Sequence, residues 1–228
     1  MISQLSDNPT KAIIFDMDGL MVDTEPLSRQ AWQTVLAEYG YELSDRVYLK
    51  MIGRRSDASV QILKETYPIP LTGEELIERK KALLAERIAT SIPVMPGFFE
   101  LQAAIKKRHI DWAVATSSSR SHAVQVLTQL NLIDQCGAVV AGNEVKNGKP
   151  APDIYLLAAK RLGYAPQNCL ALEDSLPGCH AAHTAGLITI AIPNGATRQS
   201  DFDFVSHVFM SLLDVVTNLD ELLLTSCY

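Results

Sequence analysis

Two aspartates at the end of an apolar segment are the residues best suited to chemistry in this sequence. Asp16 and Asp18 belong to a motif at residues 15–19 that follows an apolar run at residues 12–14, which is typical of a short buried strand. Two carboxylates this close together raise each other's pKa or bind a cation. The pair therefore favours a metal-assisted site in which one aspartate is the nucleophile and the other the acid and base. The alternative is an ordinary turn after a strand.

Three further groups of reactive residues stand at or beyond the ends of later apolar runs. They are Thr116 to Ser119 after the run at 112–116, Lys149 in the segment 147–153 beyond the run at 138–141, and Glu173 with Asp174 after the run at 169–173. Each group alone fits a helix cap or a turn. Four such groups in order favour a common site, because ligands of doubly wound sheets bind outside the carboxyl ends of the strands.

The elements that must position these residues alternate between strand and helix. We expect strands at 11–16, 112–116, 138–141, 169–173 and 188–192, with a weak strand at 205–210. We expect helices at 98–108, 122–131, 153–162, 177–185 and 212–224. This alternation is typical of βαβ units, so the predicted class is α/β with a Rossmann-like, doubly wound parallel sheet.

Residues 24–92 break this alternation. They show helical periodicity without a convincing strand, and a Pro/Gly junction at 93–97 ends them. We predict an all-helical insert that lies over the strand ends as a lid. The predicted domains are a catalytic core at 1–22 and 93–228 and a helical cap at 23–92.

Composition narrows the class of protein. The chain has 228 residues, 47% of them hydrophobic and 20% charged, as in a soluble globular protein. A net charge of −6 gives no electrostatic reason to bind nucleic acid or an anionic membrane. The sequence shows no secretory signal, no run that spans a bilayer and no CxxC pair among its four cysteines, one of which is Cys227. We expect a reduced, cytoplasmic monomer.

Charge balance at the predicted site calls for a metal ion. Asp16, Asp18, Glu173 and Asp174 would bring four carboxylates together, and such a cluster is unstable without compensation. Lys149 supplies one positive charge. Mg²⁺ supplies two more, and it prefers carboxylates together with a substrate phosphate.

As a set, these motifs resemble those of the haloacid dehalogenase-like superfamily. The likeness is greatest to its β-phosphoglucomutase-like and sugar-phosphatase branch, which has a helical cap after the first motif. The matching residues, in order, are Asp16-x-Asp18-Gly19, Thr116-Ser117, Gly148-Lys149-Pro150-x-Pro152-Asp153 and Glu173-Asp174.

The resemblance implies roles for the core residues. Asp16 would attack phosphorus and form an aspartyl-phosphate, and Asp18 would protonate the leaving alcohol and then activate water. Thr116 and the Ser117 N–H would bind phosphate oxygens, with Ser118 beside them. Lys149 would stabilise the charge of the transferring phosphoryl group.

The resemblance also implies a metal site and contacts from the cap. Asp16, the Asp18 carbonyl and Asp174 would hold Mg²⁺, with Glu173 in the outer shell. The cap candidates for substrate binding are Glu25, Arg54 and Arg55. The alternative for the two arginines is a solvated basic pair on the cap surface.

The expected function is Mg²⁺-dependent hydrolysis of a small phosphomonoester, such as a sugar phosphate or a nucleotide-related monophosphate. Asp18 argues against dehalogenase chemistry, which needs no acid for the leaving group. One alternative is a phosphomutase, but Ser28 stands where such relatives carry a histidine. Another is a non-catalytic regulator that binds a phosphorylated metabolite, whose usual sign is loss of Asp16, Asp18 or Lys149. For His122, His180 and His183 we expect surface or packing roles.

Overall fold

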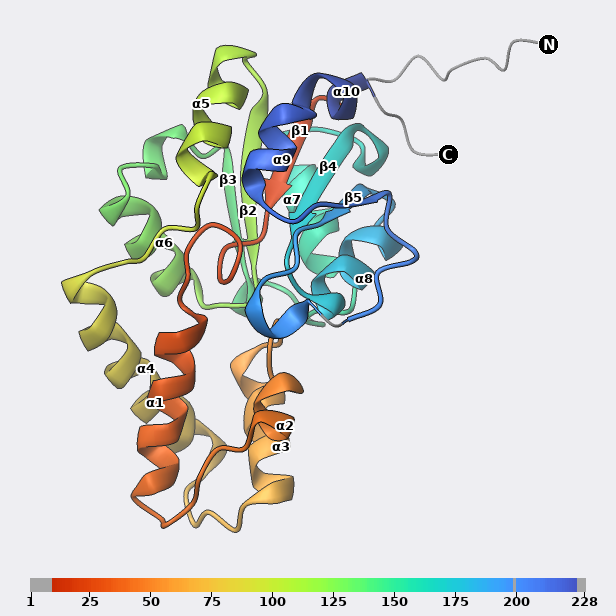
Figure 1. Ribbon diagram of the computed structural model, residues 1–228. Helices are drawn as coiled ribbons and strands as arrows, with labels where there is room; N and C mark the ends of the chain where they lie inside the picture. Colours follow the sequence, from red (N-terminus) through yellow and green to blue (C-terminus); the bar gives the residue numbers. More distant parts are fainter. Residues whose placement is uncertain (1–9, 199, 225–228) are drawn as a thin grey trace.

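A six-stranded parallel sheet forms the centre of the molecule (Figure 1). The structure is a computed structural model that describes residues 10–198 and 200–224. The strands are β1 Ala12–Phe15, β2 Asp111–Thr116, β3 Ala138–Ala141, β4 Cys169–Glu173, β5 Ile188–Ala191 and β6 His207–Val208. Their order is β3-β2-β1-β4-β5-β6, so the chain builds the sheet in opposite directions from the boundary between β1 and β4. The predicted α/β, doubly wound fold is confirmed.

Helices cover both faces of the sheet, which explains why its strands are apolar at nearly every position. On one face pack α5 Phe98–Lys107, α6 Arg120–Gln129, α9 Leu212–Thr217 and α10 Leu219–Leu224. On the other face pack α7 Asp153–Leu162 and α8 Leu176–Thr184. Every residue of β1, β3, β4 and β5 is buried, as expected of a parallel sheet between two helical layers.

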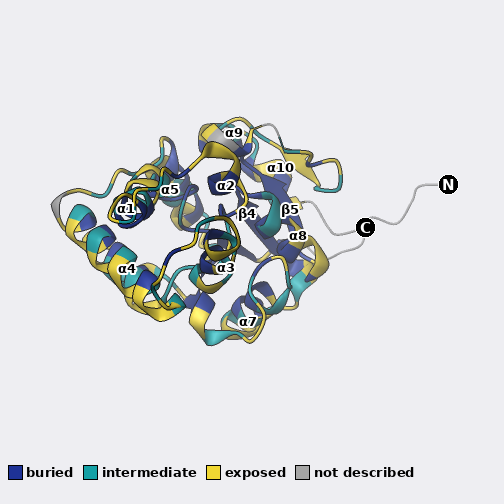
Figure 2. Cartoon of the chain, turned by 90° about the horizontal axis from the view of Figure 1, so that it is seen from below, coloured by how far each residue is buried: buried dark blue, intermediate teal, exposed yellow. Residues whose placement is uncertain are grey.

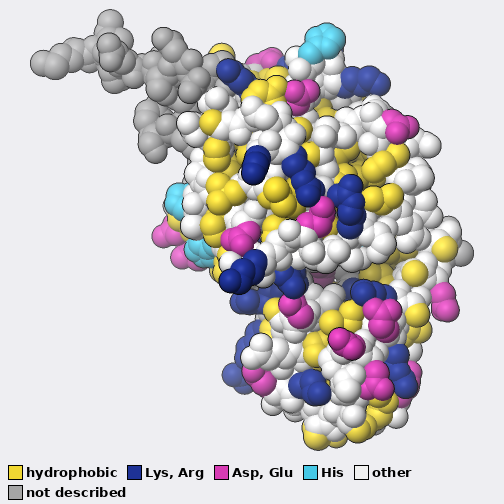
Figure 3. Space-filling model, turned by 180° about the vertical axis from the view of Figure 1, so that it is seen from behind, with side chains coloured by type: hydrophobic (Ala, Val, Ile, Leu, Met, Phe, Trp, Pro, Cys, Tyr) yellow, Lys and Arg dark blue, Asp and Glu magenta, His cyan; other side chains and the backbone are white. Residues whose placement is uncertain are grey.

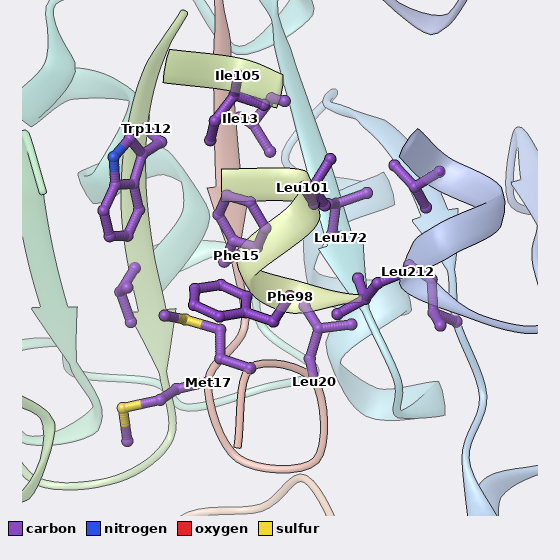
Figure 4. Close-up of a cluster of buried hydrophobic side chains, with 14 of the residues drawn as sticks. Ile13, Phe15, Met17, Leu20, Phe98, Leu101, Ile105, Trp112, Leu172 and Leu212 are labelled. Atoms are coloured by element: carbon purple, nitrogen blue, oxygen red, sulfur yellow. The ribbon is translucent and has the colours of Figure 1, made fainter. Parts of the chain in front are cut away.

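Aromatic packing holds the strand that leads to the first aspartate. Phe15 makes edge contacts with Phe98 and Trp112, at ring-centre distances of 5.9 and 5.8 Å (Figure 4). Such pairs contribute about 0.5–1.5 kcal/mol beyond the area they bury. Asp16 follows Phe15 directly, so this cluster fixes the place where Asp16 leaves the sheet.

Four helices between β1 and α5 form a second body, here called the helical segment. They are α1 Glu25–Ala37, α2 Asp45–Leu49, α3 Ser56–Thr66 and α4 Gly73–Thr90, and they have an apolar core of their own that includes Trp32. In Figure 1 the arrow of β1 points toward this segment. Its two ends run side by side, since Asp23 N donates to Pro93 O at 2.8 Å and Met95 N to Met21 O at 3.0 Å.

Some element boundaries differ from the predicted ones. Helix α6 begins at Arg120, two residues earlier than expected, because the Ser119 side chain caps it by accepting from His122 N. The predicted helix at 212–224 is two helices, which meet at Asn218, where φ is −101° and ψ is 9°. In the described ranges no helix is long and apolar enough to cross a bilayer. Cys227 lies outside them.

Candidate active site

The predicted reactive residues meet at the carboxyl edge of the sheet. Asp16, Thr116, Lys149, Glu173 and Asp174 are all buried, with at most 6% of their surface exposed. Charged side chains are this deeply buried only when they are paired or hold a metal. A cavity of about 70 Å³ lies above Asp16, between the sheet and the helical segment.

Lys149 stands at the centre of the buried charges. Its Nζ donates to Asp16 Oδ1 at 2.5 Å and also to Glu173 Oε1. Burial alone would lower the pKa of Lys149, but the charges of Asp16 and Glu173 raise it above its usual value. Lys149 is therefore a permanent cation that holds the Asp16 carboxylate in place.

Hydrogen bonds occupy both oxygens of Glu173. Oε1 accepts from Tyr155 Oη at 2.9 Å as well as from Lys149, and Oε2 accepts from Ser175 N at 3.1 Å and Ser175 Oγ at 3.0 Å. Gly178 of α8 leaves room for this carboxylate, because a Cβ there would overlap with it. The contacts make Glu173 the residue that anchors Lys149.

Asp174 lies beside the loop that follows β1. Asn194 Nδ2 donates to Asp174 Oδ2 at 3.3 Å. Gly19 permits the close approach, since its φ is +97° and a Cβ there would lie 2.5 Å from Asp174 Oδ2. Burial, and then the charges of Glu173 and Asp16, raise the pKa of Asp174 well above its usual value. The ionised form of Asp174 therefore needs a further positive charge nearby.

The donor set suits a hard divalent cation. One carboxylate oxygen from each of Asp16, Glu173 and Asp174 lies within 4.8 Å of the others. Burial raises the pKa of Asp16 more than the Lys149 charge lowers it, and the neighbouring Glu173 charge raises it further. Oxygen ligands with excess negative charge are what Mg²⁺ prefers. Because the four bonds above occupy Glu173, Asp16 and Asp174 are the carboxylates with oxygens left for an ion.

The Asp18 carboxylate has a different environment. Its Oδ1 accepts from Thr24 Oγ1 at 2.6 Å and lies 3.3 Å from His122 Nε2. Its Oδ2 accepts from Ser118 Oγ at 2.7 Å and Thr116 Oγ1 at 3.2 Å. Burial alone would raise the pKa of Asp18, but the His122 charge and these hydrogen bonds lower it well below its usual value. Asp18 is therefore ionised in this arrangement.

His122 is one residue of this site that sequence reasoning missed. A surface or packing role was expected, yet its ring nitrogen contacts Asp18 and its side chain is only 14% exposed. The available signal was its place in the first turn of the helix after β2, next to the residues expected to bind phosphate. His180 and His183 do have packing roles, against the Phe204 ring.

The helical segment supplies the roof of the cavity. Glu25 and Arg54 line it, as do Ser28, Trp32 and Lys80, among others. Tyr48 Oη donates to the Glu25 carboxylate, and burial raises the pKa of that carboxylate. Lys80, a lining residue that the sequence did not suggest, has its Nζ 5.8 Å from the centre of the Trp32 ring.

Two contacts join the core and the helical segment. The loop after β2 contacts the helical segment, and Arg55 of the helical segment contacts the core. Ser117 and Ser118 line the cavity, and Ser117 Oγ donates to Gly53 O of the helical segment at 2.9 Å. Arg55, expected to contact substrate, is not among the described residues that line this cavity. Its guanidinium instead donates to Val145 O at 3.1 Å, in the loop before Lys149. The adjacent arginines Arg54 and Arg55 thus serve different surfaces.

Two known proteins with similar sequences are phosphatases. The chain is 35% identical over 181 residues to the phosphorylated carbohydrates phosphatase of Thermotoga maritima, covering 78% of this chain and 82% of the relative. It is 34% identical over 215 residues to hexitol phosphatase B of Escherichia coli, covering 92% and 96%.

Solved structures and a family model agree with this likeness. The fold matches CbbY of Rhodobacter sphaeroides, solved in complex with phosphate, with a TM-score of 0.83 and 29% identity over 90% of this chain and 96% of the other. The model of the haloacid dehalogenase-like hydrolases matches residues 13–192, which include all four motifs. The chain therefore belongs to the haloacid dehalogenase-like hydrolase family.

Proposed function

We propose that this phosphoric monoester hydrolase is a Mg²⁺-dependent phosphatase of a small phosphomonoester, such as a sugar phosphate or a nucleotide-related monophosphate. The observation that carries the proposal is the Asp16 carboxylate, held by Lys149 at the floor of a cavity that the helical segment closes. The relatives named above act on phosphorylated carbohydrates and hexitols, which supports a hydroxylated substrate.

Asp16 is the nucleophile in this proposal. One of its carboxylate oxygens attacks phosphorus, the bond to the leaving oxygen breaks, and an aspartyl-phosphate forms. Lys149 fixes the carboxylate and neutralises charge on the phosphoryl oxygens, while Thr116 and Ser117 bind those oxygens. Mg²⁺, when held by Asp16, Asp174 and the Asp18 carbonyl, supplies further charge neutralisation and alignment.

Asp18 serves both proton transfers. In the second step it takes a proton from the water that attacks the aspartyl-phosphate, which suits the ionised form favoured by its low pKa. In the first step it gives a proton to the leaving alkoxide and so must first be protonated. Substrate phosphate would draw the hydroxyls of Thr116 and Ser118 away from Asp18, which removes two hydrogen bonds to its ionised form.

The helical segment acts as the cap in this proposal, with residues 23–92 as the cap and 1–22 with 93–228 as the core. Residues of both the cap and the core line the cavity of about 70 Å³, so the cap covers the place where the substrate would bind. The roof of the cavity carries hydroxyls and charges, among them Ser28, Arg54 and Lys80, which suit a polyol or sugar. The cap therefore selects the leaving group.

A panel of phosphate monoesters tests the proposal. Hexose and hexitol phosphates, nucleoside monophosphates and β-glucose 1-phosphate are assayed with Mg²⁺, and both free phosphate and sugar products are measured. We expect free phosphate from at least one ester, lost in Asp16→Asn and retained in Asp134→Asn, which makes the same change at an exposed position. Turnover by Asp16→Asn would refute the nucleophile. Isomerised sugar with little free phosphate would indicate the mutase, despite Ser28 in the roof.

A further inference from the structure

Arg55 bridges the helical segment and the core. Its Nη1 donates to Val145 O at 3.1 Å and to Lys146 O at 3.3 Å, about ninety residues away in the chain. Its Nη2 forms an ion pair with Asp57 Oδ2 at 2.8 Å. The planar guanidinium can make these contacts together, whereas a lysine has a single nitrogen to offer.

Gly148 of the core forms a slot for the Arg55 side chain, and Gly142 lies at the edge of this slot. A Cβ at Gly148 would overlap with Cδ of Arg55 and lie 2.9 Å from its Cγ. A Cβ at Gly142 would meet Ser117 O first, and would lie 3.1 Å from the same Cγ. The core surface thus leaves space for this one side chain beside the loop of residues 145–149. Figure 3 shows Lys and Arg side chains along the boundary between the two bodies.

The backbone next to Arg55 contacts two further core loops. Gly53 O accepts from Ser117 Oγ after β2, and a Cβ at Gly53 would lie 2.5 Å from Ser175 Oγ after β4. In Figure 2, the view from below, α3, which begins just after Arg55, lies in front of the sheet. Residues 53–55 therefore contact the three core loops that carry Thr116, Lys149 and Asp174.

The loop of residues 145–149 is held from both sides. On the core side, Asn147 N and Nδ2 donate to Asp153 Oδ1 at 3.2 and 3.1 Å. On the side of the helical segment, Arg55 binds the two carbonyls before Asn147. Lys149 follows two residues later and reaches Asp16. A shift of this loop therefore moves the Lys149 ammonium relative to the nucleophile.

We propose that Arg55 is a positioning residue, which sets the place of Lys149 when the helical segment is docked on the core, and is not a substrate contact. The inference rests on the proposed phosphatase function and deepens it. Docking of the cap then completes the site as well as closing it, because the Arg55 guanidinium supplies the donors for Val145 O and Lys146 O.

Kinetics of three variants test the positioning role. In Arg55→Ala, kcat is expected to fall about tenfold to a hundredfold with a smaller change in KM, since misplacing a catalytic group by about 1 Å costs this much. Arg55→Lys should recover part of the loss. The matched control is Arg46→Ala, an exposed arginine of α2, which should behave as wild type. A higher KM with unchanged kcat in Arg55→Ala would indicate substrate contact and overturn the proposal.

A double-mutant cycle with Gly148→Ala tests the slot. The atoms nearest to a Cβ at Gly148 all belong to Arg55, so the new methyl group should displace that side chain and lower kcat as Arg55→Ala does. In the Arg55→Ala background the same methyl group has space, so it should cost little more. Fully additive losses would show that Gly148→Ala acts without Arg55.

Hydrogen exchange of residues 145–149 gives a readout that needs no turnover. These amides should exchange faster in Arg55→Ala than in wild type and in Arg46→Ala. Unchanged exchange would overturn the positioning role even if the protein is a phosphatase. Faster exchange in a protein that hydrolyses no ester would instead contradict the proposed function and leave the docking contact in place.

Discussion

Removal of the buried Tyr155 hydroxyl tests how strongly a hydrogen bond stabilises the buried charge of Glu173. Tyr155 of α7 and Glu173 are both fully buried, and Tyr155 Oη donates to Glu173 Oε1 at 2.9 Å. Burial and the Glu173 charge raise the pKa of Tyr155 well above its usual value, so the hydroxyl stays protonated and acts as a donor. Tyr155→Phe keeps the ring in the core and removes only this bond.

The expected loss in the free energy of unfolding is the contribution of one hydrogen bond to a charged acceptor. Such bonds contribute about 1.5–3 kcal/mol to the free energy of unfolding. Glu173 Oε1 keeps its bond from Lys149, so no acceptor is left without a donor and the lower end applies. For a protein of this size a loss of about 1.5 kcal/mol lowers Tm by roughly 3–6 °C. We also expect kcat to fall, because Glu173 anchors Lys149.

Thermal unfolding of two variants provides the assay. The matched control is Tyr164→Phe, which removes a hydroxyl that donates to Asp111 Oδ2 at 2.6 Å on the exposed surface. Exposed hydrogen bonds to carboxylates add little stability, so Tm of the control should stay close to that of wild type. Equal shifts for the two variants, or no shift for Tyr155→Phe, would refute the argument that burial strengthens the Tyr155 bond.

Two more predictions follow from the buried carboxylates. The pKa values of Asp16 and Asp174 are raised in the folded state, so the stability they contribute is present at low pH and is lost as pH rises through those values. Tm of the metal-free protein should therefore fall as pH rises above the usual pKa of an aspartate, and Mg²⁺ should raise Tm most at the upper end of that range. A Tm that does not respond to Mg²⁺ in calorimetry would contradict the metal site. Gly178→Ala should lower the free energy of unfolding in urea more than Tyr155→Phe does, because the new alanine Cβ overlaps with the Glu173 carboxylate. An equal or smaller loss would show that α8 can shift to make room for the methyl group.

The strands of the sheet could be predicted from the sequence because helices cover both faces of the sheet. Strands covered on both faces need apolar residues at nearly every position, and the runs at 138–141 and 169–173 match β3 and β4 to the residue. Parallel strands place their carboxyl ends at one edge, so the meeting of Asp16, Thr116 and Glu173 also follows from the sequence. Helix boundaries are set by single caps, such as Ser119 for α6, and were less accurate.

The contacts between elements were not predictable in the same way. His122 reaches Asp18, and Tyr155 reaches Glu173, because α6 and α7 lie against the loops at particular rotations. Sequence periodicity indicates which face of a helix is buried but not which buried neighbour a polar atom meets. Arg54 and Arg55 make the same point, since adjacent residues of one type contact the cavity and the core loop respectively.

Four carboxylates of nearly the same chemistry acquire different properties through the donors around them. Asp18 receives hydroxyl donors and the His122 charge, which keep it ionised. Glu173 receives four hydrogen bonds, which use its oxygens to hold Lys149. Asp16 and Asp174 are buried with few donors, so their charge is the costliest and a divalent cation would stabilise them most. The division of roles thus depends on the loops after β2 and β4 as much as on the acidic residues themselves, and the same four carboxylates with other donors would not perform the same chemistry.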